Sequence, residues 1–206
     1  NFAIQPNGPV PQGVFGYDPT ISKPKMDLDK AKALLQEAAQ ELGFSPSNPL
    51  KVPITYFAGH TTGKSASTIL ASNVNQLNTG FILEPNSMPA SLFFAKANKH
   101  EHAVYTLGWP ANYPDAEEHI RAFGDFRLGS GLGIATRVQY DSSEVQNLLD
   151  QEILETDLTK RAEIISQIIQ IINQDNHYIF IDQPSTVYVL RDNVHGWSIE
   201  MPTNSI

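Results

Sequence analysis

Apolar residues in this chain follow two spacings in turn, a helical repeat of three or four residues and the strict alternation of a strand. The helical repeat runs through residues 28–42, and the alternation follows over residues 51–57. Helix-like and strand-like segments continue to alternate along the rest of the chain. This order favours an α/β fold, in which helices cover a sheet.

Small polar residues mark where several of the helices begin, because an N-cap side chain accepts a bond from a free N–H of the first turn. Asp27, Ser142 or Ser143, and Asp157 are such residues. The predicted helices are residues 28–42, 65–77, 90–97, 116–124, 143–153 and 158–172. The predicted strands are residues 51–57, 81–84, 103–107, 178–181 and 186–190. The isoleucine-rich stretch 164–172 is typical of a buried core helix.

A proline-rich segment opens the chain. Its prolines are Pro6, Pro9, Pro11, Pro19 and Pro24. Because proline fixes its own backbone angle and disfavours a helical conformation of the preceding residue, residues 1–25 are predicted to be an ordered loop. The rest of the chain divides into a main body, residues 26–176, and a segment of terminal strands, residues 177–206.

Acidic residues outnumber basic ones, with 22 Asp and Glu against 14 Lys and Arg and a formal net charge of −8. The basic residues form no cluster, so nucleic acid and anionic membranes are not expected partners. The chain has no cysteine, which excludes disulfides, thiolate metal sites and cysteine nucleophiles. Residues 1–10 lack the basic and apolar regions of an export signal, so we expect any such signal to lie outside this chain.

Five motifs occur along the chain in a characteristic order. They are Gly16-Tyr17-Asp18-Pro19, the Asp-x-x-Lys-Ala-x-x-Leu-Leu pattern of residues 27–35, Gly108-Trp109-Pro110-Ala111-Asn112-Tyr113-Pro114-Asp115, residues 157–161, and residues 187–196. The series resembles the extracytoplasmic solute-binding proteins of the oligopeptide- and dipeptide-binding type, family 5, which serve ABC importers. The resemblance spans nearly the whole chain and corresponds to the carboxy-terminal lobe only.

The resemblance implies a mixed sheet with flanking helices, as one lobe of a two-lobe periplasmic-binding-protein-like fold. Residues 1–25 would enter from the hinge, residues 26–176 would form ligand-binding lobe II, and residues 177–206 would return toward lobe I. In such proteins a ligand held between the lobes shifts an equilibrium between open and closed forms. The expected partners are an oligopeptide or oligosaccharide ligand and an ABC permease in the membrane.

The resemblance also implies where such a protein works and in what form. We expect a monomer outside the cytoplasm, in the periplasm or lipid-anchored at the cell surface. We expect no cofactor and no catalytic activity.

The resemblance places the ligand site in one short segment. Its residues are Gly108, Trp109, Pro110, Ala111, Asn112, Tyr113 and Asp115. The indole of Trp109 offers a rigid platform for a peptide plane, a side chain or a sugar ring, although a tryptophan that only packs the lobe is equally typical. Asp115 either adds charge to the site or caps the helix that follows it.

Two residues of this segment depart from the pattern of the peptide-binding relatives. Those relatives place an Asp at the position of Asn112, where its carboxylate pairs with the α-ammonium group of the ligand. An amide supplies no charge, and a charge-assisted hydrogen bond is roughly twice as strong as a neutral one. Pro110 has no N–H to donate to a ligand backbone. Both departures favour a ligand other than an ordinary peptide, such as an oligosaccharide.

Other side-chain groups allow competing interpretations. The histidines are His60, His100, His102, His119, His177 and His195. Without a His-Glu-x-x-His motif or a thiol they are best explained as surface residues, and His119 is retained as a metal-chelate candidate because the family has nickel-binding relatives. A hydrolase would require His119, Asp115, Glu118 and a serine to converge. Glu117 and Glu118, adjacent on a helix, are expected simply to face water.

Overall fold

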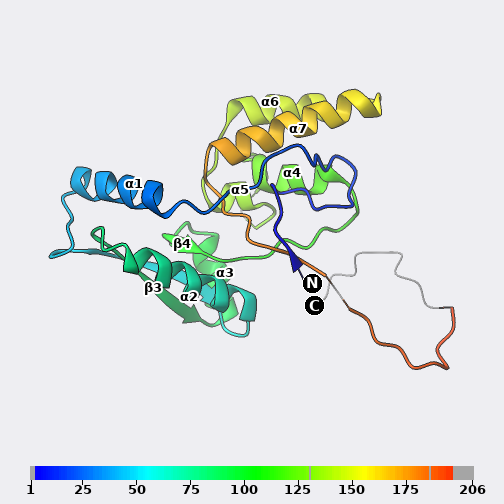
Figure 1. Cartoon of the computed structure of the whole chain (residues 1–206). Coiled ribbons are helices and arrows are strands. Elements are labelled where there is room, and N and C mark those ends of the chain that lie inside the picture. The colour runs from blue at the N-terminus through cyan, green and yellow to red at the C-terminus, as the bar shows by residue number, and fades with distance from the viewer. Residues whose placement is uncertain (1–2, 130, 186, 197–206) are drawn as a thin grey trace. The chain divides into compact units, whose positions relative to one another are not determined.

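The structure, a computed structural model, describes residues 3–129, 131–185 and 187–196 (Figure 1). It divides into two compact units, which we call the sheet unit, residues 25–108, and the helical unit, residues 1–24 with residues 109–206. The boundaries between the two compact units thus lie after Pro24 and after Gly108. The boundaries predicted from the sequence, 1–25, 26–176 and 177–206, describe functional segments and stay a prediction.

The sheet unit is built on strand β2 (Leu50–Phe57), which lies between β3 (Phe81–Met88) and β4 (Val104–Tyr105). Both neighbours run parallel to β2. Helices α2 (Thr61–Gln76) and α3 (Ala90–Ala97) pack against the sheet, and α1 (Leu28–Glu41) precedes it in the chain. Ile54 and Phe93 are fully buried here. The predicted α/β class with flanking helices is confirmed.

The helical unit contains α4 (Ala116–Gly124), α5 (Ile134–Arg137), α6 (Ser143–Glu152) and α7 (Leu158–Gln174). Two short strands, β1 (Ala3–Ile4) and β5 (Gln183–Pro184), form a separate antiparallel pair. Helices α6 and α7 form the predicted hairpin and lie side by side (Figure 1). The core of this unit is centred on the buried isoleucines of α7, which are Ile165, Ile168, Ile169 and Ile172.

The opening segment packs closely against the helical unit. Gly16 has a φ of +86°, and a Cβ on it would lie 2.8 Å from the Cβ of Ala116 and 2.9 Å from Cδ1 of Ile165. Both the left-handed backbone and the close approach therefore require glycine at this position. The segment that the sequence predicted as an ordered loop is tightly packed at this point.

Local signals located most of the helices correctly. Helices α3 and α4 begin and end at the predicted residues, and the caps at Asp27, Ser142 and Asp157 each accept a backbone bond. Strand β3 continues past the predicted residue 84 and through Pro85, because an edge strand tolerates proline. Helix α5 was not predicted. None of the helices in the described ranges has the length and apolar character of a membrane span.

The two strands predicted near the carboxy terminus, residues 178–181 and 186–190, are wrong, because the described residues of these ranges form no strand. Residue 186 lies outside the described residues. The alternation itself is present over residues 178–181. The rings of Tyr178 and Phe180 pack on Phe123, with centroids 5.2 and 5.5 Å from it, whereas Ile179 and Ile181 point to solvent and are 72% and 49% exposed. A strand also needs a hydrogen-bonded partner, and in the described chain only β5 of this region has one.

Candidate ligand-binding site

The predicted site segment leads directly into helix α4. Gly108 is the last residue of the sheet unit, and the rest of the segment belongs to the helical unit. Pro110, Asn112 and Tyr113 are exposed, while Ala111 and Asp115 are partly buried. Trp109 is also partly buried, and its indole Nε1 is inaccessible and without a hydrogen-bond partner among the described residues. Both interpretations of Trp109, as a binding platform and as a packing residue, therefore stay open.

Asp115 caps helix α4, as one of the two interpretations predicted. Its Oδ1 accepts a bond from the backbone N–H of Glu117 at 2.9 Å. Arg161 also donates to both carboxylate oxygens, Nη1 to Oδ2 at 3.0 Å and Nη2 to Oδ1 at 2.6 Å. Burial raises the pKa of Asp115, but the bonds from Arg161, the backbone N–H of Glu117 and the charge of Arg161 together outweigh it and hold the pKa below its usual range. The charge of Asp115 is thus already paired within the protein.

Arg161 joins four segments of the helical unit. Its Nε donates to Oε1 of Glu152 at 2.7 Å, and its guanidinium lies over the ring of Phe15, 5.2 Å from the centroid. Phe15 in turn forms a parallel backbone bridge with Asp115. We call Phe15, Asp115, Glu152 and Arg161 the Arg161 cluster. It fixes the start of α4 to the opening segment, to the end of α6 and to α7.

Glu152 is the most enclosed member of the Arg161 cluster. Its side chain is 0% exposed, and its second oxygen, Oε2, has no hydrogen-bond partner among the described residues. Burial raises the pKa of Glu152 in spite of the bonds from Arg161. The carboxylate therefore depends on Arg161 for its compensation.

Two further glutamates lie on the first turn of α4 beside the predicted site. Glu117 accepts bonds from the hydroxyl of Tyr113 and from Nη1 of Arg121, the latter at 3.2 Å. Burial and the bond to Glu117 raise the pKa of Tyr113, so its hydroxyl remains a donor at neutral pH. Glu118 accepts from Nδ2 of Asn112 at 2.7 Å and from the backbone N–H of Asn112 at 3.4 Å. Both glutamates are thus held by neighbouring side chains, whereas their adjacent positions on a helix predict that they simply face water.

In the part of the chain that the structure describes, no group of three or more His, Asp or Glu side chains is placed to bind a metal ion. His119, expected at the surface, is instead 4% exposed, and burial lowers its pKa to about 4. His102 is also partly buried, stacked on Phe93. No described hydrogen bond joins His119 to Asp115, Glu118 or a described serine, so the convergence that a hydrolase needs is absent from the described residues.

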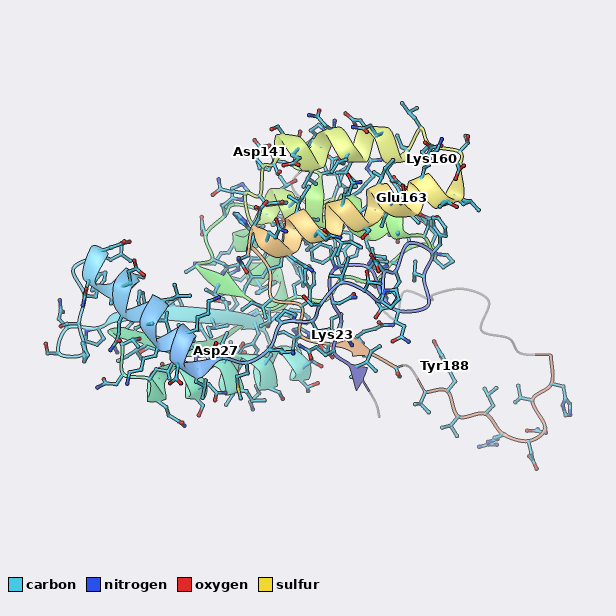
Figure 2. The ribbon with its side chains drawn as sticks, turned by 45° about the horizontal axis from the view of Figure 1, so that its top comes forward. Lys23, Asp27, Asp141, Lys160, Glu163 and Tyr188 are labelled. Carbon is cyan, nitrogen blue, oxygen red and sulfur yellow. The ribbon has the colours of Figure 1, made fainter. Side chains whose placement is uncertain are left out.

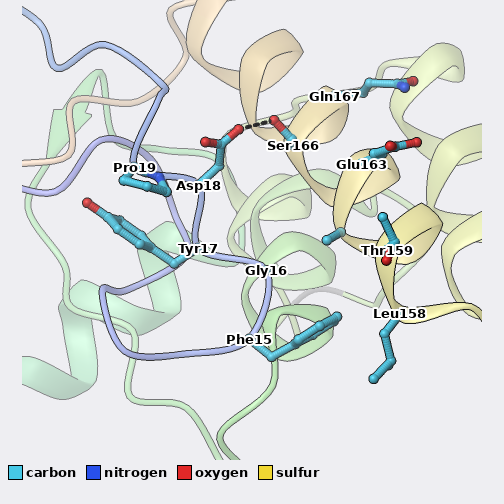
Figure 3. Close-up of a pocket in the computed structure, with 11 residues that line it drawn as sticks. Phe15, Gly16, Tyr17, Asp18, Pro19, Leu158, Thr159, Glu163, Ser166 and Gln167 are labelled. Carbon is cyan, nitrogen blue, oxygen red and sulfur yellow. Dashed lines mark hydrogen bonds between the residues drawn. The ribbon is translucent and has the colours of Figure 1, made fainter.

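A separate groove of about 700 Å³ runs between the opening segment and α7 (Figure 3). The residues that line it are Phe15, Gly16, Tyr17, Asp18, Pro19, Leu158, Thr159, Ala162, Glu163, Ser166 and Gln167. Asp18 is held by the hydroxyl of Ser166 at 2.6 Å, and this bond and those from Thr20 lower its pKa. Glu163 is exposed on α7 (Figure 2). The groove is open to solvent, and among its lining residues no buried side-chain nitrogen or oxygen lacks a hydrogen-bond partner.

A family model and several known proteins resemble this chain. The model of the family described as bacterial extracellular solute-binding proteins, family 5 Middle, matches residues 1–126. The probable D,D-dipeptide-binding periplasmic protein DdpA of Escherichia coli K12 is 23% identical over 193 residues, which are 94% of this chain and 35% of that protein. The oligopeptide-binding protein OppA of Bacillus subtilis 168 is 24% identical over 142 residues, 68% of this chain and 25% of OppA.

Solved structures share the fold. The periplasmic binding protein DppA of Helicobacter pylori, solved in complex with the peptide STSA, superposes with a TM-score of 0.75 at 21% identity. The superposition covers 89% of this chain and 34% of DppA. The predicted lobe of a periplasmic-binding-protein-like fold is thereby confirmed. The chain spans between a quarter and about a third of the length of the curated relatives it matches.

Proposed function

Since this chain belongs to the bacterial extracellular solute-binding proteins of family 5, we propose that it forms the ligand-binding lobe of the solute-binding component of an ABC importer. The protein captures a peptide-like ligand in a cleft between this lobe and a second one, outside the cytoplasm, and delivers it as a monomer to a membrane permease. The family match supports this proposal most directly, because residues 1–126 include the whole predicted site segment.

Binding by closure explains why such a protein needs no chemistry. A ligand that contacts both lobes only in the closed form stabilises that form by its differential affinity, and a permease then recognises it. Residues 109–113 suit one wall of the cleft, since they combine an aromatic ring with an exposed amide and a phenol. The Arg161 cluster holds the far end of this loop at the start of α4. A fixed loop loses less entropy when it binds.

The relatives support one ligand class, and the two sequence departures support another. DdpA and OppA are described as dipeptide- and oligopeptide-binding proteins, and the DppA structure contains a peptide. Asn112 and Pro110 are the grounds for expecting an oligosaccharide instead. Of the two, we propose the peptide-like ligand, with the oligosaccharide as an outcome of the test.

Calorimetric titration of the natural full-length protein with peptides of two to five residues and with oligosaccharides tests this function. We expect heat of binding with peptides. Binding of oligosaccharides alone would replace the proposed ligand class, and binding of neither would overturn the proposed function.

Replacing Trp109 with alanine should lower the affinity for the best-binding peptide by about tenfold, which corresponds to about 1.4 kcal/mol of binding free energy. An aromatic platform contributes to binding on this scale. Trp109→Phe is the matched control, since it keeps a ring and should lose less than about threefold in affinity. The titration above measures both variants, and the melting temperature checks that each is folded. Full affinity in folded Trp109→Ala would show that Trp109 only packs the lobe.

A further inference from the structure

One arginine of the helical unit serves two carboxylates. Arg161 donates from Nη1 and Nη2 to the two oxygens of Asp115, at 3.0 and 2.6 Å. Its Nε donates to Oε1 of Glu152 at 2.7 Å, and Nη2 lies 2.6 Å from the same oxygen. Nη2 therefore faces one oxygen of each carboxylate, and a single positive charge is divided between two negative charges.

Glu152 depends on Arg161 more than Asp115 does. Its side chain is 0% exposed, and Oε2 has no hydrogen-bond partner among the described residues. Burial, together with the charges of Glu117 and Asp115, keeps the pKa of Glu152 raised although Arg161 lies beside it. The side chain of Asp115 is 30% exposed and also accepts the N–H of Glu117. Because no other described cation pairs with Glu152, this buried carboxylate competes with Asp115 for the guanidinium.

Asp115 joins the Arg161 cluster to residues 109–114, which we call the binding loop. It directly follows the loop and is the N-cap of α4. The loop itself gains little from burial, because most of its residues are exposed. The hold of Arg161 on Asp115 therefore determines how firmly the carboxyl end of the loop is fixed. A loop that is fixed before the ligand arrives loses less entropy on binding.

We propose that Arg161 is a positioning residue for the ligand, which acts through Asp115 and whose hold on the binding loop is limited by competition from Glu152. This inference rests on the proposed function, in which the loop forms one wall of the cleft. It assigns Asp115 to the support of the loop rather than to contact with the ligand. A buried carboxylate on α6, whose side chain is inaccessible to any ligand, thereby adjusts the affinity of the site.

Calorimetric titration of the natural full-length protein with the peptide, or the oligosaccharide, that binds best tests this competition. Asp115→Asn keeps a good N-cap for α4 and leaves Arg161 to Glu152, so the loop loses its ion pair while the cap remains. Its affinity should fall by roughly 3- to 10-fold. Glu152→Gln leaves Arg161 wholly to Asp115, and its affinity should rise by about threefold, which a purely structural role of the cluster does not predict. In the double variant this rise should vanish, because Glu152→Gln acts only through Asp115.

Asp150→Asn is the matched control, because it removes a carboxylate from another shared arginine. Arg127 bonds both to Asp150, which is exposed on α6, and to Asp125. Asp125 is the C-cap of α4, at the opposite end of the helix from the binding loop. This variant should keep the wild-type affinity within about twofold. A loss as large as that of Asp115→Asn would show a general effect of charge and would contradict the inference.

The melting temperature checks that each variant is folded, and Asp115→Ser, which also caps a helix, replaces Asp115→Asn if the latter does not fold. Lower affinity in Asp115→Asn with unchanged affinity in Glu152→Gln would show that Asp115 contacts the ligand itself. Wild-type affinity in folded Asp115→Asn would show that the ion pair does not position the loop. Either result overturns this inference but leaves the proposed function intact. Failure of the wild type to bind any peptide or oligosaccharide contradicts the proposed function itself.

Discussion

Replacing Arg161 with methionine should lower the free energy of unfolding of the helical unit by about 3–5 kcal/mol. The substitution leaves Glu152, whose side chain is 0% exposed, without the one cation that pairs with it among the described residues. It also removes the two bonds that hold Asp115 at the start of α4. Breaking a buried ion pair is costly mainly because the remaining charge stays buried and uncompensated. Chemical denaturation of the full chain, followed by circular dichroism, measures the loss.

Two variants separate this effect from the loss of any salt bridge. Lys51→Met breaks the exposed pair with Glu84, whose side chains are 65% and 49% exposed, and should cost no more than about 1 kcal/mol. The double variant Arg161→Met with Glu152→Gln should recover much of the stability, because no buried charge is left unpaired. A loss below about 1 kcal/mol in Arg161→Met would show that water reaches Glu152 and that the cluster does not fix α4.

Sequence reasoning succeeded where the determining contacts are local. Asp27, Ser142 and Asp157 cap helices by accepting bonds within three residues of themselves, so their neighbours alone identify them. The helices at 90–97 and 116–124 were predicted to the residue for the same reason. Strand alternation at 178–181 was also read correctly. Whether that segment forms a strand depends on a hydrogen-bonded partner elsewhere in the chain. Local alternation of apolar residues does not show whether such a partner exists.

The candidate site shows the same division. The cap at Asp115 was predictable from its position before a helix, whereas its ion pair with Arg161 joins residues 46 positions apart. The contact between Asn112 and Glu118 depends on how the loop turns into α4, which composition and spacing do not determine. A polar residue in the turn before a helix, six positions ahead of a glutamate, is the one signal that suggests the contact. This contact is therefore visible only in the folded structure.

Because of His119, the free energy of unfolding should be about 2 kcal/mol lower at pH 5 than at pH 7. Burial lowers the pKa of His119 to about 4 in the folded protein, while an unfolded histidine keeps an ordinary value of about 6.5. Between these two values the unfolded chain binds a proton and the folded protein does not. Stability is therefore lost as the pH falls through this window. Urea denaturation at the two pH values measures the difference.

A variant without the imidazole isolates the contribution of His119 from those of the carboxylates, among them Asp115 and Asp125, whose pKa values are lowered, and Glu152, whose pKa is raised. His119→Gln cannot take up a proton, so most of the 2 kcal/mol difference between pH 7 and pH 5 should disappear, even if the variant is less stable at pH 7. If His119→Gln keeps this difference, the imidazole is hydrated in solution. The first turns of α4 would then be more open to water than the packing around His119 implies, and the loop that α4 anchors would be a less rigid wall for a ligand.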